Sequence, residues 1–377
     1  MGRDPSVGVY ESRSQEWTDR RTRHYGDRLD RFAARLASGG TARRGGDATD
    51  SAGPGSDKLV ADLGCGPGWH LDGLPPPVLA LDASRAMLAR VGAADGGTAP
   101  LRVAADLRAL PLRDRCLRGA WASRSYIHLA RAEVPLALAD LHRALVPGAA
   151  VELHLFAGDT EWDERADDDF PGRRFSHWPE SWLRDVLVGA GLAAESIEQR
   201  NKVLLVAAKR LHTLADTVAP GMRVLVCGLN PSLYAAEVGV GFARGSNRFW
   251  PAALAAGLVS RARDPRHALV ARNIGMTDLV KRPTRQAAEL TAAEYGEGLA
   301  RLERLAERLE PGVVCFVGLA GWRAAVDRQA SPGPQPRRIG GRPAYLMPST
   351  SGLNARTSLD ELTAHLRAAA SLSEGGG

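Results

Sequence analysis

Apolar, strand-like segments alternate with helical patterns twice along this chain, and that alternation limits the folds open to it. In the first series the expected strands are Leu59–Leu63, Val78–Leu81, Leu101–Ala104, Arg118–Ala122, Ala150–Phe156 and Val203–Ala208. The pattern begins again after Gly221, with expected strands at Val224–Gly228, Val313–Gly318 and Ala344–Met347. Such alternation is typical of a parallel sheet flanked by helices. We therefore predict two α/β domains, each with three layers.

Helical patterns complete this picture. Residues 15–37 are expected to form a polar helix, because apolar side chains recur there at helical spacing: Trp17, Tyr25, Leu29, Phe32 and Leu36. In the second series, Thr291 with Glu294 and Ser358 with Glu361 form capping boxes, which are typical of helix starts. Each box precedes a segment with leucines on one face, so two amphipathic helices are predicted.

A length of 377 residues is enough for two domains. Residues 38–57 are rich in Gly, Ser and Ala and are expected to be a flexible segment. The predicted organisation is an N-terminal helix with this segment at 1–57, a first domain at 58–209, a second domain at 210–370, and a disordered tail at 371–377.

Composition excludes several classes of protein. No apolar run approaches the ~18 residues of a membrane span, and the first residues lack the apolar stretch of a signal peptide. We therefore expect a soluble protein of the cell interior. The four cysteines lie far apart without a Cys-x-x-Cys pair or a histidine at ligand spacing. This argues against a metal site, an iron–sulfur cluster and a disulfide framework.

The positive charge is concentrated in the second half of the chain. Residues 1–209 hold 28 basic and 29 acidic side chains, whereas residues 210–377 hold 21 basic and 14 acidic ones. A basic domain suits a polyanionic partner such as nucleic acid, and a merely soluble basic surface remains the alternative.

A glycine-rich turn follows the first expected strand. The sequence V-A-D-L-G-C-G-P-G ends at Gly68 and places glycines at 64 and 66 as well. Glycines there allow a tight turn and a close approach of the backbone to a ligand. Asp82 ends the next strand, where a carboxylate can accept hydrogen bonds from ribose hydroxyls, and Asp106 follows the third strand. The G-x-G-x-G spacing disfavours a dinucleotide enzyme.

With these motifs, residues 10–209 resemble the class I S-adenosylmethionine-dependent methyltransferases. The resemblance implies a Rossmann-like fold and S-adenosylmethionine as the cofactor. The cofactor-binding residues that it implies are Asp62, Gly64, Gly66, Gly68, Asp82, Asp106 and Leu107. Ser123, Arg124 and His128 follow the fourth strand, where this family contacts its methyl acceptor, although His128 suits a purely structural role equally well. Motifs of DNA amino-group and cytosine-carbon methyltransferases are absent, so the acceptor is not readable.

Three motifs of the basic half are expected to meet at one sheet edge. The first is G-L-N-P-S at residues 228–232, directly after a strand. The second runs from Gly241 to Trp250 and combines arginines with aromatic residues, and the third is the loop from Leu346 to Arg356. Positive charge, a stacking aromatic ring and an exposed apolar side chain are what a protein needs to flip a base out of a duplex.

Residues 213–369 resemble the mismatch-specific uracil/thymine-DNA glycosylases of the uracil-DNA glycosylase superfamily, through G-L-N-P, F-A-x-x-x-N-R-F-W, G-M-T-D-L-V-K-R-P-T and M-P-S-T-S-G-L. The resemblance implies that Asn230 positions the attacking water, that Phe242 stacks on the flipped base, and that Leu353 fills the vacated stack. The remaining residues implied at the base pocket and the DNA are Leu229, Ser232, Asn247, Ser349, Ser351, Gly352 and Arg356.

The residue types constrain the reaction. An Asn amide does not take a proton near neutral pH, so the implied mechanism depends on an oriented water and a stabilised pyrimidine anion. None of these motifs offers a Schiff-base lysine as nucleophile, so the reaction is expected to stop at an abasic site. Two positions depart from the family pattern: Ser232 stands where glycine is usual, and the loop after Leu353 is one residue longer.

We therefore expect a methyltransferase-like domain fused to a monofunctional DNA glycosylase that removes uracil opposite guanine in base-excision repair, with double-stranded DNA as partner. Two alternatives stay open. In one, the methyltransferase is the main enzyme and the second domain anchors it to DNA. In the other, the first domain is an inert cofactor-binding regulator.

Overall fold

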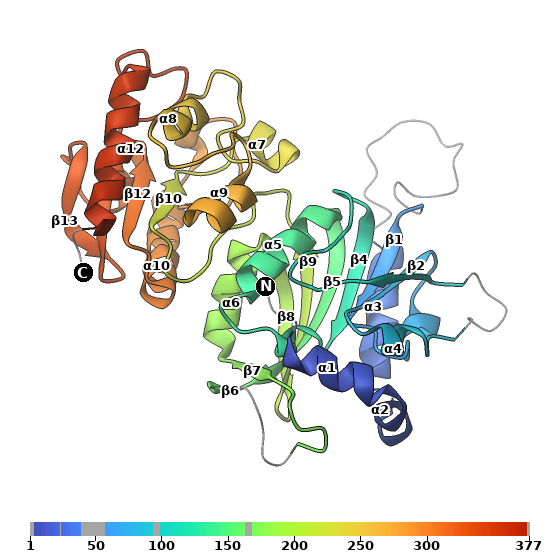
Figure 1. The fold of residues 1–377 in the computed structure, drawn as a ribbon. Helices are drawn as coiled ribbons and strands as arrows, with labels where there is room; N and C mark the ends of the chain where they lie inside the picture. The colour runs from blue at the N-terminus through green and yellow to red at the C-terminus, as the bar shows by residue number, and fades with distance from the viewer. Residues whose placement is uncertain (1–3, 23, 39–56, 93–98, 163–167, 375–377) are drawn as a thin grey trace, which may run out of the picture. The chain divides into compact units, whose positions relative to one another are not determined.

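The computed structural model describes residues 4–22, 24–38, 57–92, 99–162 and 168–374 (Figure 1). These residues form two compact units. The N-terminal unit comprises Met1–Leu187 and Leu192–Leu211, and the C-terminal unit comprises Val188–Gly191 and His212–Gly377. Most of the predicted flexible segment, residues 39–56, lies outside the described residues.

The N-terminal unit is built on a mixed sheet with the strand order β3-β2-β1-β4-β5-β7-β6, to which β9 and then β8 are added beside β5. Its strands are β1 (Leu59–Leu63), β2 (Val78–Asp82), β3 (Leu101–Ala104), β4 (Leu117–Ser123), β5 (Leu145–Ala157), β6 (Glu161–Trp162), β7 (Phe175–Trp178), β8 (Leu192–Arg200) and β9 (Val203–Arg210). Its helices are α1 (Pro5–Ser12), α2 (Ser14–Arg20), α3 (Gly26–Ser38), α4 (Arg85–Leu88), α5 (Val134–Ala144) and α6 (Glu180–Gly189), with short 3-10 turns at Leu71–Gly73 and Tyr126–His128.

Strand β4 shows why α3 packs where it does. The rings of Trp121 on β4 and Phe32 on α3 lie 5.7 Å apart, and both are fully buried. Side chains on one face of a strand are two residues apart, so Gly119 faces the same helix. A Cβ at Gly119 would lie 2.5 Å from Leu36, which means that the helix approaches the sheet closely because this strand position has no side chain. Helix α5 also packs against the sheet (Figure 1).

The expected strands of both units are present, and the largest difference is that β5 begins at Leu145 rather than Ala150. The single helix predicted over residues 15–37 is wrong. The structure has α2 and α3 instead, because Arg21 is extended and Tyr25 takes a positive φ of 63°. A tertiary contact accounts for the turn, since the Tyr25 ring packs edge-on against His154 with the ring centres 4.6 Å apart.

The C-terminal unit contains a five-stranded sheet in the order β11-β10-β12-β14-β13, parallel except for the edge strand β13. Its strands are β10 (Val224–Gly228), β11 (Ile274–Asp278), β12 (Val313–Val317), β13 (Gly333–Ile339) and β14 (Arg342–Met347). Its helices are α7 (Leu233–Val238), α8 (Phe249–Ala255), α9 (Pro265–Arg272), α10 (Ala292–Leu309), α11 (Leu319–Ala325) and α12 (Leu359–Glu374), with a 3-10 turn at Ala287–Glu289.

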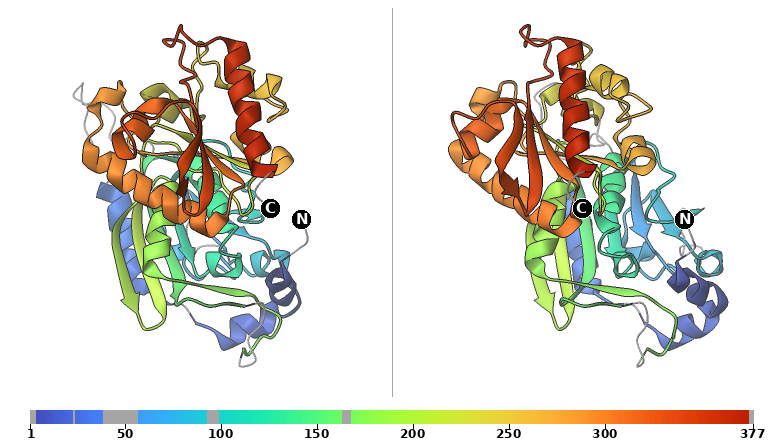
Figure 2. Two further views of the ribbon diagram at one scale, coloured as in Figure 1. Left: turned by 90° about the vertical axis from the view of Figure 1, so that its left-hand side faces the viewer. Right: turned by 60° about the vertical axis from the view of Figure 1, so that its left-hand side comes forward.

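Helices cover both faces of this second sheet. Helix α12 lies along one face (Figure 2), where its Leu362 and Leu366 join a buried cluster with Cys315 of β12 and with α8. The neighbouring position on β12, Phe316, points to the opposite face and packs edge-on against Trp322 of α11, with the ring centres 4.9 Å apart. Burial on both faces explains why β10, β12 and β14 have nearly continuous apolar sequences.

A buried group of charges lies below the carboxyl end of β11. Asp216 accepts hydrogen bonds from Thr277 Oγ1 at 2.6 Å, Lys281 Nζ at 2.7 Å and Arg301 Nη1 at 2.7 Å. Burial alone would raise the pKa of Asp216, but the two cations outweigh burial and hold the pKa below its ordinary value. Because each charge has partners, the group tolerates a site that is closed to water.

Both predicted capping boxes are confirmed. Thr291 and Glu294 exchange hydrogen bonds at the start of α10, and Ser358 and Glu361 do so before α12. The predicted tail is wrong for residues 371–374, because α12 continues to Glu374. Leu372 packs against the sheet core and so extends the helix, while residues 375–377 lie outside the described part.

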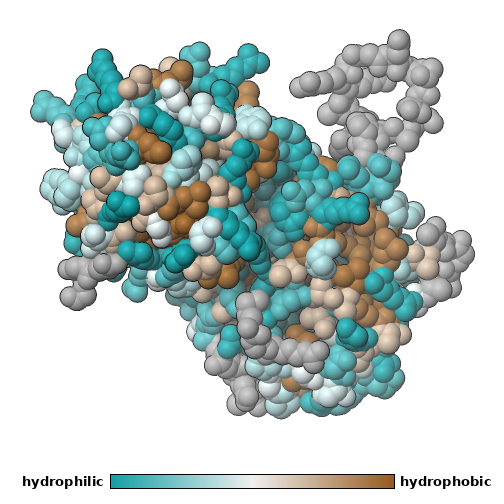
Figure 3. All heavy atoms as spheres, turned by 45° about the horizontal axis from the view of Figure 1, so that its top comes forward, coloured by the Kyte–Doolittle hydropathy of each residue, from teal (hydrophilic) through white to brown (hydrophobic). Residues whose placement is uncertain are grey.

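Five strands were not predicted: β6, β7, β8, β11 and β13. Strands β6 and β7 are only two and four residues long, and the other three lack a clear apolar pattern. Strand β8 has a single buried residue, β11 contains a glycine, and β13 holds two prolines at the sheet edge. Within the described ranges, no helix is long and apolar enough to cross a membrane. On the face shown in Figure 3, hydrophobic residues form limited areas among hydrophilic ones.

Candidate functional site

The glycine-rich turn after β1 has the backbone that its sequence predicts. Gly64, Gly66 and Gly68 have positive φ angles of 74°, 54° and 90°, which side chains rarely adopt. The amides of Gly64 and Cys65 both donate to the Leu81 carbonyl, at 2.7 and 3.0 Å. A Cβ at Gly64 would lie 2.3 Å from the Cβ of Ser125, so only glycine fits there.

Asp82 fixes this turn from the end of β2. Its Oδ2 accepts the Gly66 amide at 2.8 Å, and its Oδ1 accepts the Ser84 amide at 2.8 Å. Burial raises the pKa of Asp82, while these amide hydrogen bonds oppose the rise. Carboxylate oxygens each have a further lone pair, so Asp82 retains the capacity to accept hydroxyl donors.

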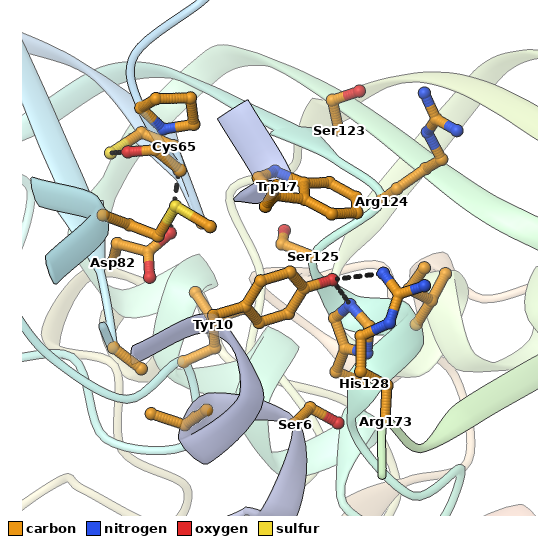
Figure 4. A pocket seen from close by; sticks show the side chains of 18 of the residues that line it. Ser6, Tyr10, Trp17, Cys65, Asp82, Ser123, Arg124, Ser125, His128 and Arg173 are labelled. Carbon is orange, nitrogen blue, oxygen red and sulfur yellow. Dashed lines mark hydrogen bonds between the residues drawn. The ribbon is translucent and has the colours of Figure 1, made fainter. Parts of the chain in front are cut away.

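A cavity of about 440 Å³ lies beside the turn (Figure 4). The predicted residues that line it are Gly64, Gly66, Asp82, Asp106, Leu107, Ser123, Arg124 and His128. The structure therefore brings together both the residues predicted for a cofactor and those predicted for an acceptor. Glycines that expose the backbone and a carboxylate at the next strand end fit the ribose and amino-acid parts of S-adenosylmethionine.

Two predicted residues are not among those that line the cavity. Asp62 is buried below the turn, and burial raises its pKa to about 8. Among the described residues, no donor lies within hydrogen-bond distance of its Oδ2, which is 4.0 Å from His70 Nδ1. Gly68 serves packing, because a Cβ there would lie 2.8 Å from the Leu71 side chain.

Asp106 lies at the cavity wall with its carboxylate paired. Arg108 donates to both carboxylate oxygens, with Nε at 3.0 Å from each. Burial would raise the pKa of Asp106, but Arg108 outweighs burial and lowers it. Arg108 thus holds the Asp106 carboxylate in place beside Leu107, where its oxygens can accept hydrogen bonds.

The N-terminal helices contribute cavity residues that sequence reasoning missed. Tyr10 of α1 hydrogen-bonds His128 Nε2 at 2.9 Å, and Arg173 Nη1 donates to the same hydroxyl at 3.1 Å (Figure 4). Trp17 of α2 also lines the cavity. Isolated aromatic residues far from the glycine-rich motif give no local signal, so only the fold reveals them. Burial lowers the pKa of His128 to about 4, which leaves its ring neutral.

In the C-terminal unit, Asn230 follows β10 at the carboxyl edge of the sheet. Its Nδ2 donates to the Arg282 carbonyl at 2.9 Å and to Thr284 Oγ1 at 2.8 Å. A carbonyl can only accept, so this contact fixes which end of the amide is nitrogen. The side-chain oxygen is consequently directed away from these contacts. Thr284 is a partner that the sequence did not single out.

Phe242 takes a positive φ of 56°, and its ring stacks on Phe249 with the ring centres 4.3 Å apart. A Cβ at Gly228 would lie 3.4 Å from the Phe242 ring and 2.4 Å from Asp278 Oδ1. The ring and the carboxyl therefore border the same glycine. Burial raises the pKa of Asp278 to about 6. Sequence reasoning placed Asp278 within a motif but gave it no role.

The loop after β14 presents Leu353, whose side chain is 96% exposed. Arg248 holds this loop, since its guanidinium donates to the carbonyls of Thr357 and Asn354. Asn354 adds an internal brace through a hydrogen bond from Nδ2 to the Ser349 carbonyl at 2.8 Å. A Cβ at Gly352 would lie 2.8 Å from the Ser246 carbonyl oxygen, so glycine permits this close approach.

The other predicted residues have local partners. Ser232 caps α7 by accepting the Ala235 amide at 3.1 Å, and Asn247 accepts the Phe249 amide at 2.9 Å. Ser349 and Ser351 accept the amides of Ser351 and Leu353, each at 3.3 Å.

Leu229 and Arg356 complete the set. The Leu229 carbonyl accepts the Val280 amide at 2.9 Å and so continues the pairing of β10 with β11. Arg356 is exposed on the loop that carries Leu353. The structure therefore places the Phe242 ring beside Gly228, two residues before Asn230, and it places Leu353 on a loop held by Arg248.

Two family models match the chain. Residues 60–148 match the model described as "Methyltransferase domain". Residues 215–371 match the model described as "Uracil DNA glycosylase superfamily". The first range contains the glycine-rich turn with Asp82 and Asp106, and the second contains Asn230, Phe242 and Leu353.

Solved structures of S-adenosylmethionine-dependent methyltransferases are similar to part of the chain. One from Mesorhizobium loti is 24% identical over 41% of this chain and 91% of its own, with a TM-score of 0.33. One from Methanosarcina mazei is 15% identical over 41% of this chain and 93% of its own, with a TM-score of 0.37. The 1,6-didemethyltoxoflavin-N1-methyltransferase of Burkholderia thailandensis is 18% identical over 54% of this chain and 85% of its own, with a TM-score of 0.38.

Each family match lies within one unit, and the methyltransferase match covers only part of the N-terminal unit. The chain joins a methyltransferase domain to a domain of the uracil DNA glycosylase superfamily.

Proposed function

We propose that the C-terminal domain is a DNA glycosylase that hydrolyses the N-glycosidic bond of uracil, or of thymine and related damaged bases, mismatched with guanine. Its partner is double-stranded DNA, and the product is an abasic site for base-excision repair inside the cell. The superfamily match and the basic charge of this half support the proposal.

The hydrogen bonding of Asn230 is the observation that carries the proposal. Because Nδ2 is held by Arg282 and Thr284, Oδ1 is the atom that receives a hydrogen bond from the attacking water. Asn cannot remove a proton at neutral pH, so its role is to orient the water. The glycosidic bond is labile enough to break without a general base. Catalysis then comes from positioning and from stabilisation of the departing pyrimidine anion.

The other residues of the proposed site lie in the chain segments that leave the carboxyl ends of β10 and β14. Phe242 has one ring face on Phe249, and the flipped base stacks on the other. Leu353 enters the space that the base leaves, with Gly352 and Arg356 beside it. The backbone near Leu229, together with Ser232 and Asn247, borders the base, while Ser349 and Ser351 bind flanking phosphates.

The reaction stops after base removal because a lysine nucleophile is missing. Lys281 is the sole lysine of residues 210–377, and its Nζ is ion-paired with Asp216 at 2.7 Å in a buried position. A paired, buried ammonium does not attack the sugar as a free amine. The enzyme is therefore a monofunctional glycosylase.

The N-terminal domain binds S-adenosylmethionine and transfers its methyl group, and the cavity beside the glycine-rich turn favours this second activity. Gly64, Gly66 and Asp82 hold the methionine and ribose parts, and Asp106 with Leu107 frames the adenine. Gly68 supports the turn because its missing side chain lets Leu71 pack closely, and Asp62 is buried. A DNA-anchored methyltransferase and an inert cofactor-binding regulator are the competing explanations of the fusion.

Cleavage of a labelled duplex tests the glycosylase directly. Incubation with a G:U duplex followed by alkali should produce strand breaks, and a G:T duplex should react more slowly. Uracil lacks the methyl group that the space between Ser232 and Phe242 must admit, and it leaves more readily. Equal single-turnover rates on the two duplexes would contradict this order. If the G:U duplex stays intact, the glycosylase proposal fails and the C-terminal domain would only anchor the methyltransferase to DNA.

Asn230→Ala should lose at least about a hundredfold in excision rate while DNA binding is retained, because one oriented catalytic group is removed. Single-turnover cleavage and a separate binding titration measure the two effects. Asn273→Ala, at the C-cap of α9, is the matched control and should cleave normally. Wild-type cleavage by Asn230→Ala would exclude Asn230 from the mechanism.

Leu353→Ala should leave the melting temperature almost unchanged, because the side chain is exposed. Excision should fall in paired duplex and much less in single strands, where there is no stack to refill. A core leucine would instead cost about 2–5 kcal/mol of stability. Val270→Ala, another exposed apolar residue, controls for surface effects, and equal loss on both substrates would argue against the wedge role.

Asp82→Ala should weaken S-adenosylmethionine binding about ten- to hundredfold, the usual effect of losing hydrogen bonds to a charged group. Isothermal titration measures the affinity, with exposed Asp72→Ala as control. Wild-type protein that gives no binding heat would support a degenerate first domain.

A further inference from the structure

A hydroxyl backed by an imidazole and a carboxylate opens on the cavity of the N-terminal domain. Ser123 ends β4 and lines the cavity (Figure 4), and its Oγ lies 3.1 Å from His154 Nδ1. The other ring nitrogen, Nε2, lies 3.3 Å from Glu152 Oε1. Glu152 and His154 are two residues apart on β5, so both face the same side of the sheet.

The partners fix where the protons are. Glu152 accepts a hydrogen bond from Arg28 Nε at 2.7 Å and is ion-paired with Arg28, so it is an acceptor only. His154 Nε2 must then carry the hydrogen, and Nδ1 has the free lone pair. Ser123 consequently donates its hydroxyl hydrogen to Nδ1. Burial lowers the pKa of His154, and the hydrogen bond to Glu152 opposes this effect without cancelling it. The ring is therefore neutral at pH 7 and can take a proton.

Tyr10 and His128 form a second hydroxyl–imidazole pair on the same cavity, but the surroundings differ. His128 Nδ1 lies 2.8 Å from the Arg174 carbonyl, so Nε2 accepts the Tyr10 hydrogen. The group behind this ring is an uncharged carbonyl, and the Arg173 guanidinium beside Tyr10 disfavours a protonated ring. Glu152 instead stabilises an imidazolium at His154. Of the two pairs, Ser123–His154 is the better proton acceptor.

We propose that Ser123, backed by His154 and Glu152, removes the proton of the methyl acceptor, and that this acceptor is a small phenol-type compound. The inference rests on the proposed methyltransferase function. The aromatic side chains of the cavity wall, Tyr10, Trp17 and Trp69, fit an aromatic ring. A phenol near pH 7 keeps its proton, because its pKa is about 10, and therefore needs a base.

The proton and methyl transfers balance. The phenol oxygen attacks the methyl carbon of S-adenosylmethionine, the carbon–sulfur bond breaks, and its electron pair stays on sulfur as S-adenosylhomocysteine forms. The phenol proton passes to Ser123 Oγ while the Ser123 proton passes to His154 Nδ1. Ser123 is the catalytic residue because it touches the acceptor, and His154 and Glu152 are positioning residues that act through it.

A series of phenols of graded acidity tests the proposal through release of S-adenosylhomocysteine from the full-length protein. For simple phenol at pH 7, Ser123→Ala should lose about a hundredfold or more. For a nitrophenol that is already largely ionised, the loss should be slight. The phenol rate of the variant should rise tenfold per pH unit, whereas the wild-type rate should stay level above the pKa of His154.

Ser125→Ala is the matched control, since it removes a nearby hydroxyl that has no hydrogen-bond partner among the described residues. It should keep the level pH profile of the wild type. Equal loss by Ser123→Ala on every phenol would indicate a structural role and overturn the proposal. Failure of the wild type to methylate any phenol, with cofactor binding intact, would overturn it as well.

A second measurement needs no turnover. Nitrogen-15 shifts of labelled histidine, with His154→Gln identifying the signal, should show hydrogen on Nε2 and none on Nδ1 of His154 at neutral pH. The opposite tautomer would overturn the relay. Absence of S-adenosylmethionine binding in titration would reject the proposed function itself, which separates the two failures.

Discussion

Parallel pairing of β10 with β11 and of β1 with β4 is the constraint on which both sites depend. Parallel strands end at the same edge, so residues distant in sequence are delivered together without any motif that joins them. In the C-terminal domain this places Asp278 beside Gly228, two residues before Asn230. In the N-terminal domain it places Ser123 beside the glycine-rich turn, where Ser125 excludes any side chain at Gly64.

Much of this arrangement was predictable from residue patterns. Strands β1, β4 and β10, which lead into the two sites, were expected because their buried apolar runs leave few alternatives, whereas β11 was not; the capping boxes located α10 and α12. The glycine-rich turn and the G-L-N-P motif identified Asp82 and Asn230 because local backbone demands and chemistry coincide there. Family membership of the two domains agrees with the resemblances stated from the sequence.

Other parts depend on contacts that no local pattern records. The predicted N-terminal helix is divided because α2 ends at Arg20 and α3 begins at Gly26, directly after Tyr25, which packs on His154 more than a hundred residues away. Tyr10 reaches the cavity through the fold of α1, and Thr284 meets Asn230 across a sheet edge. The pairing of Glu152 with Arg28 likewise joins β5 to α3. Such residues have ordinary sequence surroundings, so only the tertiary structure distinguishes them.

The hold of Arg248 on the loop around Leu353 has an entropic consequence. A loop that became ordered only on contact with DNA would lose backbone freedom of about 1–2 kcal/mol per residue at that moment. Here the guanidinium restricts the loop through the Asn354 and Thr357 carbonyls before DNA arrives. In the proposed glycosylase, more of the DNA-binding free energy is then available to distort the duplex rather than to order the protein.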